Sequence, residues 1–600
     1  MSDRAVDARE IQNLPAMFFA QAERFADDPF VWGRQDGTYV PLTWRQTADD
    51  ITALANGLIN TMGVEPGERV MIVSENRPEW LIADIAIKAT GAITVPTYTT
   101  NTAVNHMHII DDSGAEVAIV STPELAKPLI AAAAEADHKL RVIVIDDAES
   151  VIDSEIETKA WADVLDAGRG GEIPPHVKTA KRDDMCSIIY TSGTGGLPKG
   201  VMLTHGGILC NCDGAAEVVR LLGIGEEVFL SFLPLSHAYE HVGGLYFPIC
   251  LGAQIYYCER VDTLVNRMAE VRPTIMTAVP RLYETMRGRI NQSLKGQSAL
   301  RTKLFEKTLE LGTKRYEDPK SLSLWDKLVD MLCERLVREK VRERFGGRLK
   351  ALVSGGAPLN YDVGVFFTAL GVRILQGYGQ TESSPVASAN LPNNIKLHTV
   401  GPPLRGVEVK IAGDGEILLR GELVMKGYWN DPDATIAAID DDGWLHTGDV
   451  GHIDNEGCIV ITDRKKDLIV NSGGDNISPQ RVEGVLCLEE EIEQIMVFGD
   501  RRPYLTAVIV PSADWMKKWA KDNGKESAEL DDLADDSDFR SAIGEAVKRA
   551  NTDMSVIEKV RKFIIAPHPF TVENGQMTPT LKVRRHAVLR EFREDLEALY

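Results

Sequence analysis

The sequence predicts an α/β protein: a large N-terminal body of mixed, mostly parallel sheets covered by helices, followed by a small α+β C-terminal domain. Two observations support this class. Short β-branched runs alternate with helix-like stretches through most of the chain, which is typical of parallel sheets. The chain also has 600 residues, too many for one hydrophobic core, so at least two domains are expected.

The predicted strands of the body are short runs rich in Val, Ile and Tyr, bounded by turn residues. They begin at Arg69, Ala92, Val117, Arg141, Met185, Glu227, Gln254, Pro273 and Leu349. We expect the body to cover residues 1–463 and the C-terminal domain to cover residues 464–600. Within the body, Lys, Arg, Glu and Leu recur at helical spacing over residues 283–345. This spacing predicts a helical insertion, most simply a solvated helical hairpin.

Composition narrows the possible partners and compartment. A formal charge of −23 argues against a general affinity for nucleic acid or for an anionic membrane. The eight cysteines include no C-x-x-C pair, which fits a reducing compartment. The N-terminal segment has no apolar signal core, and the most apolar window, residues 242–257, is too short to span a bilayer. We expect a cytoplasmic protein; peripheral contact at the inner face of the membrane and a homodimeric state stay open.

The most informative segment is YTSGTGGLPKG, residues 190–200. Its glycines let successive backbone N–H groups approach phosphate oxygens, while hydroxyls and Lys199 add donors and positive charge. The segment does not match the G-x-x-x-x-G-K-[ST] loop, because Lys199 lies between Pro198 and Gly200. We therefore predict a different kind of polyphosphate loop; the alternative is a Gly/Ser/Thr-rich surface turn.

Two later segments fit a nucleotide site. Gly355 and Gly356 follow an apolar strand, where a flat ring could lie against bare backbone. The run QGYGQTES offers Tyr378 for stacking on adenine, Thr381 as a donor to phosphate and Glu382 as a hard oxygen ligand for Mg²⁺. Each signal is weak by itself, because a Gly-Tyr-Gly turn commonly ends a strand.

Two polar segments follow. GWLHTGD places Asp449 in a predicted turn, where its carboxylate could accept both hydroxyls of a ribose or could simply cap a helix. The cluster DRKKD, residues 463–467, precedes a predicted strand and a Gly-Gly turn. We interpret this cluster as a domain boundary that also carries chemistry; the alternative is an exposed charged turn.

The order of these motifs resembles a known family. YTSGTGGLPKG, LPLSHAYEH, SGGAPL, YGQTE, TGD, DRKKD, SGG and PTLKVRR occur in the order and at the approximate spacing of the AMP-forming adenylating superfamily of acyl-CoA synthetases, peptide-synthetase adenylation domains and luciferases. Within it, the chain looks like a long-chain fatty acyl-CoA synthetase. The resemblance covers about residues 13–593 and includes the helical insertion.

The resemblance implies a two-step reaction with ATP, Mg²⁺, a fatty acid and CoA. The fatty carboxylate would attack the α-phosphate of MgATP to give acyl-AMP and pyrophosphate, and the CoA thiol would then displace AMP. The small C-terminal domain would be mobile and would rotate between the two steps about a hinge near Lys466.

The resemblance also implies residue roles. Thr191, Ser192, Gly193, Thr194 and Lys199 would hold the departing phosphates. Tyr378 would stack on adenine, and Thr381 would touch phosphate. Glu382 would bind Mg²⁺, and Asp449 and Arg464 would hold the ribose. Lys582 would bridge the fatty carboxylate and the α-phosphate, His237 would lie beside the carboxylate, and the pantetheine path would be lined by Gly473 and Gly474.

One position departs from the family pattern. Where the loop usually reads T-S-G-T-T-G, this chain has Gly195 in place of the second threonine. The replacement removes one hydroxyl donor, a loss of ~1 kcal/mol, which we expect to slow phosphate handling without abolishing it.

Three alternatives remain. HAYEH, residues 237–241, matches the H-x-x-E-H pattern of an inverted zinc metalloprotease, although that hypothesis leaves the downstream motifs unexplained. A non-catalytic acyl- or nucleotide-binding regulator would not need intact Glu382, Asp449, Arg464 and Lys582. Finally, the acyl group could pass to a carrier protein in place of CoA.

Overall fold

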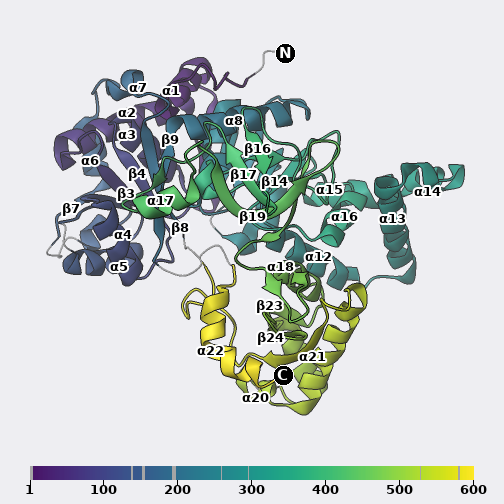
Figure 1. The fold of residues 1–600 in the computed structure, drawn as a ribbon. Helices are drawn as coiled ribbons and strands as arrows, with labels where there is room; N and C mark the ends of the chain where they lie inside the picture. The colour runs from purple at the N-terminus through teal and green to yellow at the C-terminus, as the bar shows by residue number, and fades with distance from the viewer. Residues whose placement is uncertain are drawn as a thin grey trace.

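The structure is a computed structural model that describes residues 4–600, except 137–138, 152–155, 192–196, 259, 295, 527–528 and 579–581. Figure 1 shows a large body with a smaller C-terminal domain beside it, and a pair of helices, α13 and α14, that extends from the far side of the body. The predicted fold class is confirmed.

The first eight-stranded sheet of the body is parallel apart from the antiparallel edge strands β18 and β9. In spatial order its strands are β18 (Gly427–Tyr428), β9 (Lys199–Thr204), β8 (Met185–Thr191), β4 (Ile93–Thr97), β3 (Arg69–Val73), β5 (Val117–Val120), β6 (Arg141–Val144) and β7 (Thr158–Ala160). Strand β8 ends at Thr191 and the antiparallel strand β9 begins at Lys199, so a strand, and no helix, directly follows the predicted polyphosphate loop.

The second eight-stranded sheet is also mostly parallel. Its strands are β15 (Ser388–Ala389), β14 (Ile374–Tyr378), β13 (Ala351–Ser354), β12 (Ile275–Ala278), β10 (Val228–Ser231), β11 (Gln254–Tyr257), β1 (Pro29–Gln35) and β2 (Thr38–Thr43). Every strand predicted in the body from its apolar run is present. The antiparallel hairpin β1–β2 at one edge was not predicted, because its residues alternate only weakly in polarity.

Helices fill the space between and around the two sheets. The helices of this part are α1 (Leu14–Phe25), α2 (Trp44–Met62), α3 (Pro78–Ala89), α4 (Ala103–Ser113), α5 (Pro123–Glu135), α6 (Trp161–Gly168), α7 (His176–Thr179), α8 (His205–Arg220), α9 (Ala238–Glu240), α10 (Phe247–Leu251), α11 (Leu264–Val271), α16 (Tyr361–Ala369) and α17 (Pro432–Ala438). Helix α3 is apolar on nearly all sides, as a helix enclosed by protein must be.

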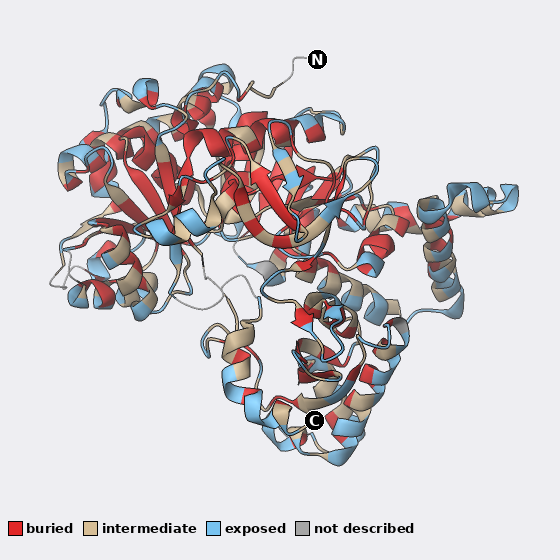
Figure 2. Cartoon of the chain, in the orientation of Figure 1, coloured by how far each residue is buried: buried red, intermediate tan, exposed pale blue. Residues whose placement is uncertain are grey.

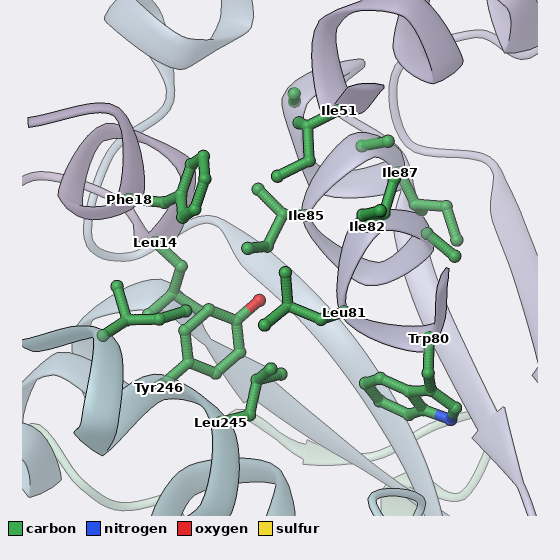
Figure 3. Close-up of a cluster of buried hydrophobic side chains, with 14 of the residues drawn as sticks. Leu14, Phe18, Ile51, Trp80, Leu81, Ile82, Ile85, Ile87, Leu245 and Tyr246 are labelled. Atoms are coloured by element: carbon green, nitrogen blue, oxygen red, sulfur yellow. The ribbon is translucent and has the colours of Figure 1, made fainter. Parts of the chain in front are cut away.

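The central core forms where α3 meets α1, α2 and the segment before α10. In Figure 3, Leu81 and Ile85 of α3 face Phe18 of α1 and Tyr246. Figure 2 shows the same region as the most continuously buried part of the molecule. This packing anchors both sheets to one another, so their strand ends keep fixed positions at the site described below.

A third sheet of the body was not foreseen from the sequence. It is antiparallel, with strands β16 (Glu408–Ile411), β17 (Glu416–Arg420), β19 (Leu445–Ile453) and β20 (Ile459–Arg464). The expectation that Asp449 lies in a turn was wrong: Asp449 lies in β19, directly opposite Arg464 in β20. Gly448, with φ +71°, provides the backbone kink that looked like a turn in the sequence.

Residues 283–345 are mainly helical, in α12 (Pro280–Leu294), α13 (Ala299–Glu317), α14 (Leu324–Cys333), the π-helical turn Glu334–Arg338 and α15 (Glu339–Arg344). The C-terminal domain contains β21 (Ile469–Val470), β22 (Asn476–Ile477), α18 (Pro479–Leu486), β23 (Ile492–Phe498), β24 (Leu505–Pro511), α19 (Ala513–Asp522), α20 (Leu530–Ala534), α21 (Ser537–Ala550), β25 (Val560–Ile565) and α22 (Arg585–Glu597). It has apolar clusters of its own, made only of residues 469–600.

Candidate active site

An open cleft of about 2940 Å³ lies between the body and the C-terminal domain. Both parts contribute to its lining. The predicted site residues on this lining are Thr191, Lys199, His237, Gly355, Gly356, Tyr378, Thr381, Glu382, Asp449, Arg464, Lys466 and Lys582. Residues far apart in the sequence thus converge on one space, because strand ends of all three body sheets open onto it.

Asp449 is the centre of a hydrogen-bonded cluster. Tyr378, at the end of β14, donates its hydroxyl to one carboxylate oxygen at 2.7 Å, and the Arg464 Nε donates to the other at 3.0 Å. Burial, followed by the negative charge of Asp449, raises the pKa of Tyr378 well above its usual value, so the phenol stays protonated. A carboxylate has about four acceptor positions, which leaves room on Asp449 for further donors such as vicinal hydroxyls.

A second chain of contacts links Glu382 to Lys199. The Tyr428 hydroxyl donates to Glu382 Oε1 at 2.8 Å, and the Lys199 ammonium lies 5.2 Å from the centre of the Tyr428 ring. Lys199 also donates to Asp431 at 2.8 Å. Tyr428 carries no motif signal, and only the antiparallel pairing of β18 with β9 brings it here. The sequence reasoning missed both Tyr428 and Asp431.

The predicted polyphosphate loop is described only at its ends. Thr191 ends β8 and pairs with Lys199, the first residue of β9, so both side chains mark the base of the loop. Ser192, Gly193 and Thr194 lie outside the described residues, as does Gly195.

Gly355, also on the cleft lining, follows β13 and faces an aromatic ring. A Cβ at Gly355 would lie 3.1 Å from the Tyr239 ring, whose hydroxyl donates to the Val353 carbonyl at 2.8 Å. The adjacent Gly356 has φ +79°, which favours glycine. The bare backbone predicted here is therefore already covered on one side by Tyr239, a residue that the sequence reasoning did not single out.

His237 stands at the N-terminus of the short helix α9. Its Nδ1 accepts a hydrogen bond from the Tyr239 backbone N–H at 3.1 Å. Burial, and then the positive charge of Lys582, lower the pKa of His237 to about 4. The imidazole is therefore neutral near pH 7, with Nε2 carrying the proton, and is able to donate a hydrogen bond without adding charge.

Lys582 comes from the C-terminal domain and reaches into the cleft. Its backbone is held by Thr578, whose Oγ1 accepts from the Lys582 N–H at 3.0 Å, and whose own N–H donates to the Lys582 carbonyl at 2.8 Å. Surrounding protein and the nearby Arg464 charge lower the pKa of Lys582 to about 8, against an opposing effect of Asp449. Its ammonium therefore shares one electrostatic environment with Arg464, Asp449 and His237.

The segment around Lys466 passes from the body to the C-terminal domain. Lys465 is tied to the body: its ammonium donates to Asp414 at 2.6 Å and to Glu416 at 3.0 Å. Lys466 is exposed and forms no ion pair with a described residue. Beyond it, the links to the body are weak, such as Asn360 to the Gly484 carbonyl at 3.4 Å and Arg281 to Glu493 at 3.6 Å.

Gly473 and Gly474 are not on the cleft lining. They form the exposed turn between β21 and β22, where the Gly473 N–H donates to Asn471 Oδ1 at 2.8 Å and Gly474 has φ +87°. In this arrangement of the domains the turn lies apart from the other predicted site residues.

The metalloprotease alternative finds no support. Glu240 accepts from Ser231 at 2.6 Å and from Thr277 at 2.5 Å, and burial raises its pKa to about 7. His241 is enclosed separately, near Asp84. Among the residues that the structure describes, there is no group of three or more His, Cys, Asp or Glu side chains that could hold a metal ion.

Comparison with known proteins agrees with this geometry. The AMP-binding enzyme family matches residues 18–429, and the AMP-binding enzyme C-terminal domain matches residues 466–600. The chain belongs to the AMP-binding enzyme family. Both matched parts contribute residues to the cleft lining, and so does the segment 430–465 between them, which contains Asp449 and Arg464.

Relatives within this family include two long-chain-fatty-acid--CoA ligases. FadD15 of Mycobacterium tuberculosis is 35% identical over 601 residues, which cover 98% of this chain and 97% of that protein. Long-chain-fatty-acid--CoA ligase 1 of Homo sapiens is 30% identical over 614 residues, which cover 96% of this chain and 83% of that protein.

Solved structures share the fold. The A-PCP didomain of carboxylic acid reductase from Segniliparus rugosus in complex with AMP has a TM-score of 0.76 at 22% identity, covering 98% of this chain and 82% of that chain. The anthranilate CoA ligase AuaEII in complex with anthranoyl-AMP has a TM-score of 0.71 at 20% identity, covering 99% of this chain and all of that chain (100%). At these identities the likeness concerns the fold alone.

Proposed function

We propose that the protein is an AMP-forming long-chain fatty acid--CoA ligase. The observation that carries the proposal is the convergence of Lys582, from the C-terminal domain, with Asp449, Arg464 and His237 of the body in one cleft. Full-length relatives whose names specify this activity support the choice of substrates. The reaction needs ATP because a carboxylate is a poor electrophile.

In the first step, an oxygen of the fatty carboxylate attacks the α-phosphorus of ATP, and the bond to the bridging oxygen breaks. Acyl-AMP forms and pyrophosphate leaves. Lys582, as an ammonium, neutralises the carboxylate and the charge that builds on the α-phosphate, while neutral His237 donates a hydrogen bond to a carboxylate oxygen. Thr191 and Lys199, with Ser192, Gly193 and Thr194, hold the departing phosphates.

The nucleoside is held on the opposite side of the cleft. Tyr378 presents its ring to adenine while its hydroxyl stays on Asp449. Asp449 accepts from the ribose hydroxyls, and Arg464 fixes the orientation of that carboxylate. Thr381 donates to phosphate. These assignments use groups that the body already holds in place before any ligand binds, which reduces the entropy lost on binding.

Glu382 fits a Mg²⁺ ion. Its Oε1 accepts from Tyr428, and Oε2 has no hydrogen bond to a described residue, so one hard oxygen faces the cleft. Magnesium is commonly held by one or two carboxylates together with substrate phosphates, and Glu382 would supply one such carboxylate. When bound, the ion would neutralise phosphate charge.

In the second step, the CoA thiolate attacks the acyl carbonyl, a thioester forms and AMP leaves. We propose that the C-terminal domain first rotates about Lys466, since Lys465 is anchored and Lys466 is not. The rotation would withdraw Lys582 and bring Gly473 and Gly474, which do not line the cleft in this arrangement, towards the pantetheine of CoA.

The test is pyrophosphate release from MgATP by the purified protein, with fatty acids of increasing chain length offered separately, each with and without CoA. We expect release that depends on the acid and is sustained only with CoA. The absence of release with every acid would contradict the proposal and favour a non-catalytic regulator. Sustained release without CoA, stimulated by an acyl carrier protein, would establish the carrier-protein alternative.

A further inference from the structure

The most exposed apolar surface in the described part of the chain lies on helix α14, far from the cleft (Figure 1). We call residues 299–344 the arm; it comprises α13, α14, the π-helical turn and α15. Six large apolar side chains along α14 and the following turn are between 46% and 81% exposed: Leu324, Trp325, Leu328, Met331, Leu332 and Leu336. Figure 2 shows α14 as one of the most exposed helices of the molecule. Soluble monomers rarely expose so many neighbouring apolar residues without a binding role.

The spacing places these residues on one face. Leu324, Leu328, Met331 and Leu332 recur every three or four positions, so they line one side of a helix. Cys333, on the opposite side, is fully buried. The exposed apolar stripe is therefore the outer face of an amphipathic helix.

The inner face is fixed to the body by buried polar contacts. Arg338 is fully buried; it donates to the Ala369 carbonyl of α16 at 2.7 Å and to the Thr308 carbonyl of α13 at 3.3 Å. A Cβ at Gly312 of α13 would lie only 2.5 Å from the Ala369 Cα, so α13 packs directly on α16. Because these contacts hold the arm, α14 cannot turn its apolar stripe inward without breaking the buried hydrogen bonds of the Arg338 guanidinium.

The charge of the arm is opposite to that of the rest of the molecule. The arm contains 12 Lys and Arg residues and 9 Asp and Glu residues, for a net charge of +3, whereas the whole chain carries −23. The remainder of the chain therefore carries −26. Such an asymmetry orients a molecule near a negatively charged surface with its positive part forward.

Charged side chains are also segregated within α14 and the turn that follows it. Asp330 and Glu334 point inward and pair with Arg315, Arg338 and Arg342. Lys327 and Arg335 are exposed beside the apolar stripe and form no ion pair with any residue in the described ranges. The outer face thus combines apolar side chains and unpaired cations.

We propose that the outer face of α14 docks onto the surface of an anionic phospholipid bilayer. Leu and Met side chains bury in the acyl boundary, Trp325 lies at the level of the headgroups, and Lys327 and Arg335 contact lipid phosphates. Among the described residues, no helix is long and apolar enough to cross a membrane, so the contact is peripheral. The functional purpose of this contact rests on the proposed function. Long-chain fatty acids partition into bilayers, and docking would bring the enzyme to its substrate.

A second copy of this chain fits the stripe less well. Two arms of net charge +3 would repel one another at close range. Helix α14 has 10 residues and is about 15 Å long, so its outer face is a narrow strip, well below the about 800 Å² per partner of a stable interface.

Vesicle flotation of the full-length protein tests the proposal. The probes are phosphatidylcholine vesicles with and without phosphatidylglycerol. We expect the wild-type protein to float with the anionic vesicles and to do so less at high salt. The variant Leu328→Glu/Met331→Glu should lose about tenfold or more of this partitioning, because two carboxylates enter the apolar contact.

The matched control is Val104→Glu/Val556→Glu, which adds the same charge at two exposed apolar positions outside the arm; these valines are 65% and 72% exposed. It should float like the wild type. Lys327→Ala/Arg335→Ala should reduce the preference for phosphatidylglycerol while leaving weaker binding to neutral vesicles. Thermal melting of each variant shows whether it is folded.

The proposal is overturned if the folded wild-type protein does not float with anionic vesicles, or if the arm variant and the control float equally. A dimer in light scattering that Leu328→Glu/Met331→Glu converts to a monomer, without vesicle binding, would also overturn it and identify a second copy as the occupant. Flotation does not require catalysis, so its result is independent of the pyrophosphate assay.

Discussion

The two sides of the cleft are built differently. On the body side, the polar groups are fastened to one another before any ligand binds: Asp449 holds Tyr378 and Arg464, and Tyr428 holds Glu382. On the C-terminal side, Lys582 brings one positive charge on a segment tied through Thr578 within its own domain. Under the proposed function, a fixed nucleotide side and a lysine that domain rotation withdraws would serve two successive reactions in one cleft.

Removal of the lysine should have the largest effect. Lys582→Ala is expected to slow acyl-AMP formation by about 10²- to 10³-fold, because a positioned charge at the reacting phosphate is lost. Thioester formation from supplied acyl-AMP should stay near the wild-type rate. Each half-reaction is followed separately, by pyrophosphate release and by thioester production. An equal loss of rate in both half-reactions would contradict the assignment of Lys582 to acyl-AMP formation alone.

Restriction of the hinge should give the reverse pattern. Lys466→Pro fixes the backbone φ angle at the position where the body's contacts end, and we expect it to slow thioester formation from supplied acyl-AMP by about tenfold or more. Acyl-AMP formation should be nearly unchanged, since the cleft is already assembled in this arrangement. Lys466→Ala, which keeps backbone freedom, is the control and should leave both steps intact. Unimpaired thioester formation by the proline variant would place the hinge elsewhere.

In the wild-type protein, the pH dependence of the two half-reactions should distinguish the contribution of Lys582 from that of the body residues. The pKa of Lys582 is lowered to about 8, so its ammonium is present below that pH and is lost as pH rises through it. Acyl-AMP formation should therefore fall about tenfold per pH unit above about pH 8. His237, with a pKa of about 4, stays neutral throughout this range.

The measurement is the rate of each half-reaction from about pH 6 to about pH 10. Lys582→Arg keeps its charge over the whole range, so whatever activity it retains should lack the alkaline decline. If wild type and Lys582→Arg declined together, another group would be titrating.

The smallest kinetic effect is expected from a substitution on the body side of the cleft. Tyr428→Phe removes the hydrogen bond to Glu382, a loss of ~1 kcal/mol, and should raise the KM for MgATP about fivefold with little change for the fatty acid. Tyr504→Phe removes a tyrosine hydroxyl outside the cleft lining and is the control. An unchanged KM, also at limiting Mg²⁺, would show that Tyr428 does not orient Glu382.

Residue patterns and motif order were sufficient to predict the fold class and the functional groups available to the site. The apolar runs beginning at Arg69 and Val117 became buried parallel strands, because a continuous β-branched run can be satisfied only inside a covered sheet. Motif order indicated the family, which the comparisons then showed. The roles given to individual residues, the boundary at residue 464 and the mobility of the C-terminal domain stay predictions.

Which residues meet depends on contacts between distant segments that no local pattern predicts. Asp449 faces Arg464 because β19 pairs with β20, and Tyr428 reaches Glu382 because β18 pairs with β9. Likewise, the apolar stripe of α14 faces outward because α13 packs on α16. Helical spacing by itself predicted only an ordinary helical hairpin. The physical reason is the same in each case: local patterns record which face of an element is apolar, whereas pairing between distant segments sets what that face, or its polar edge, will touch.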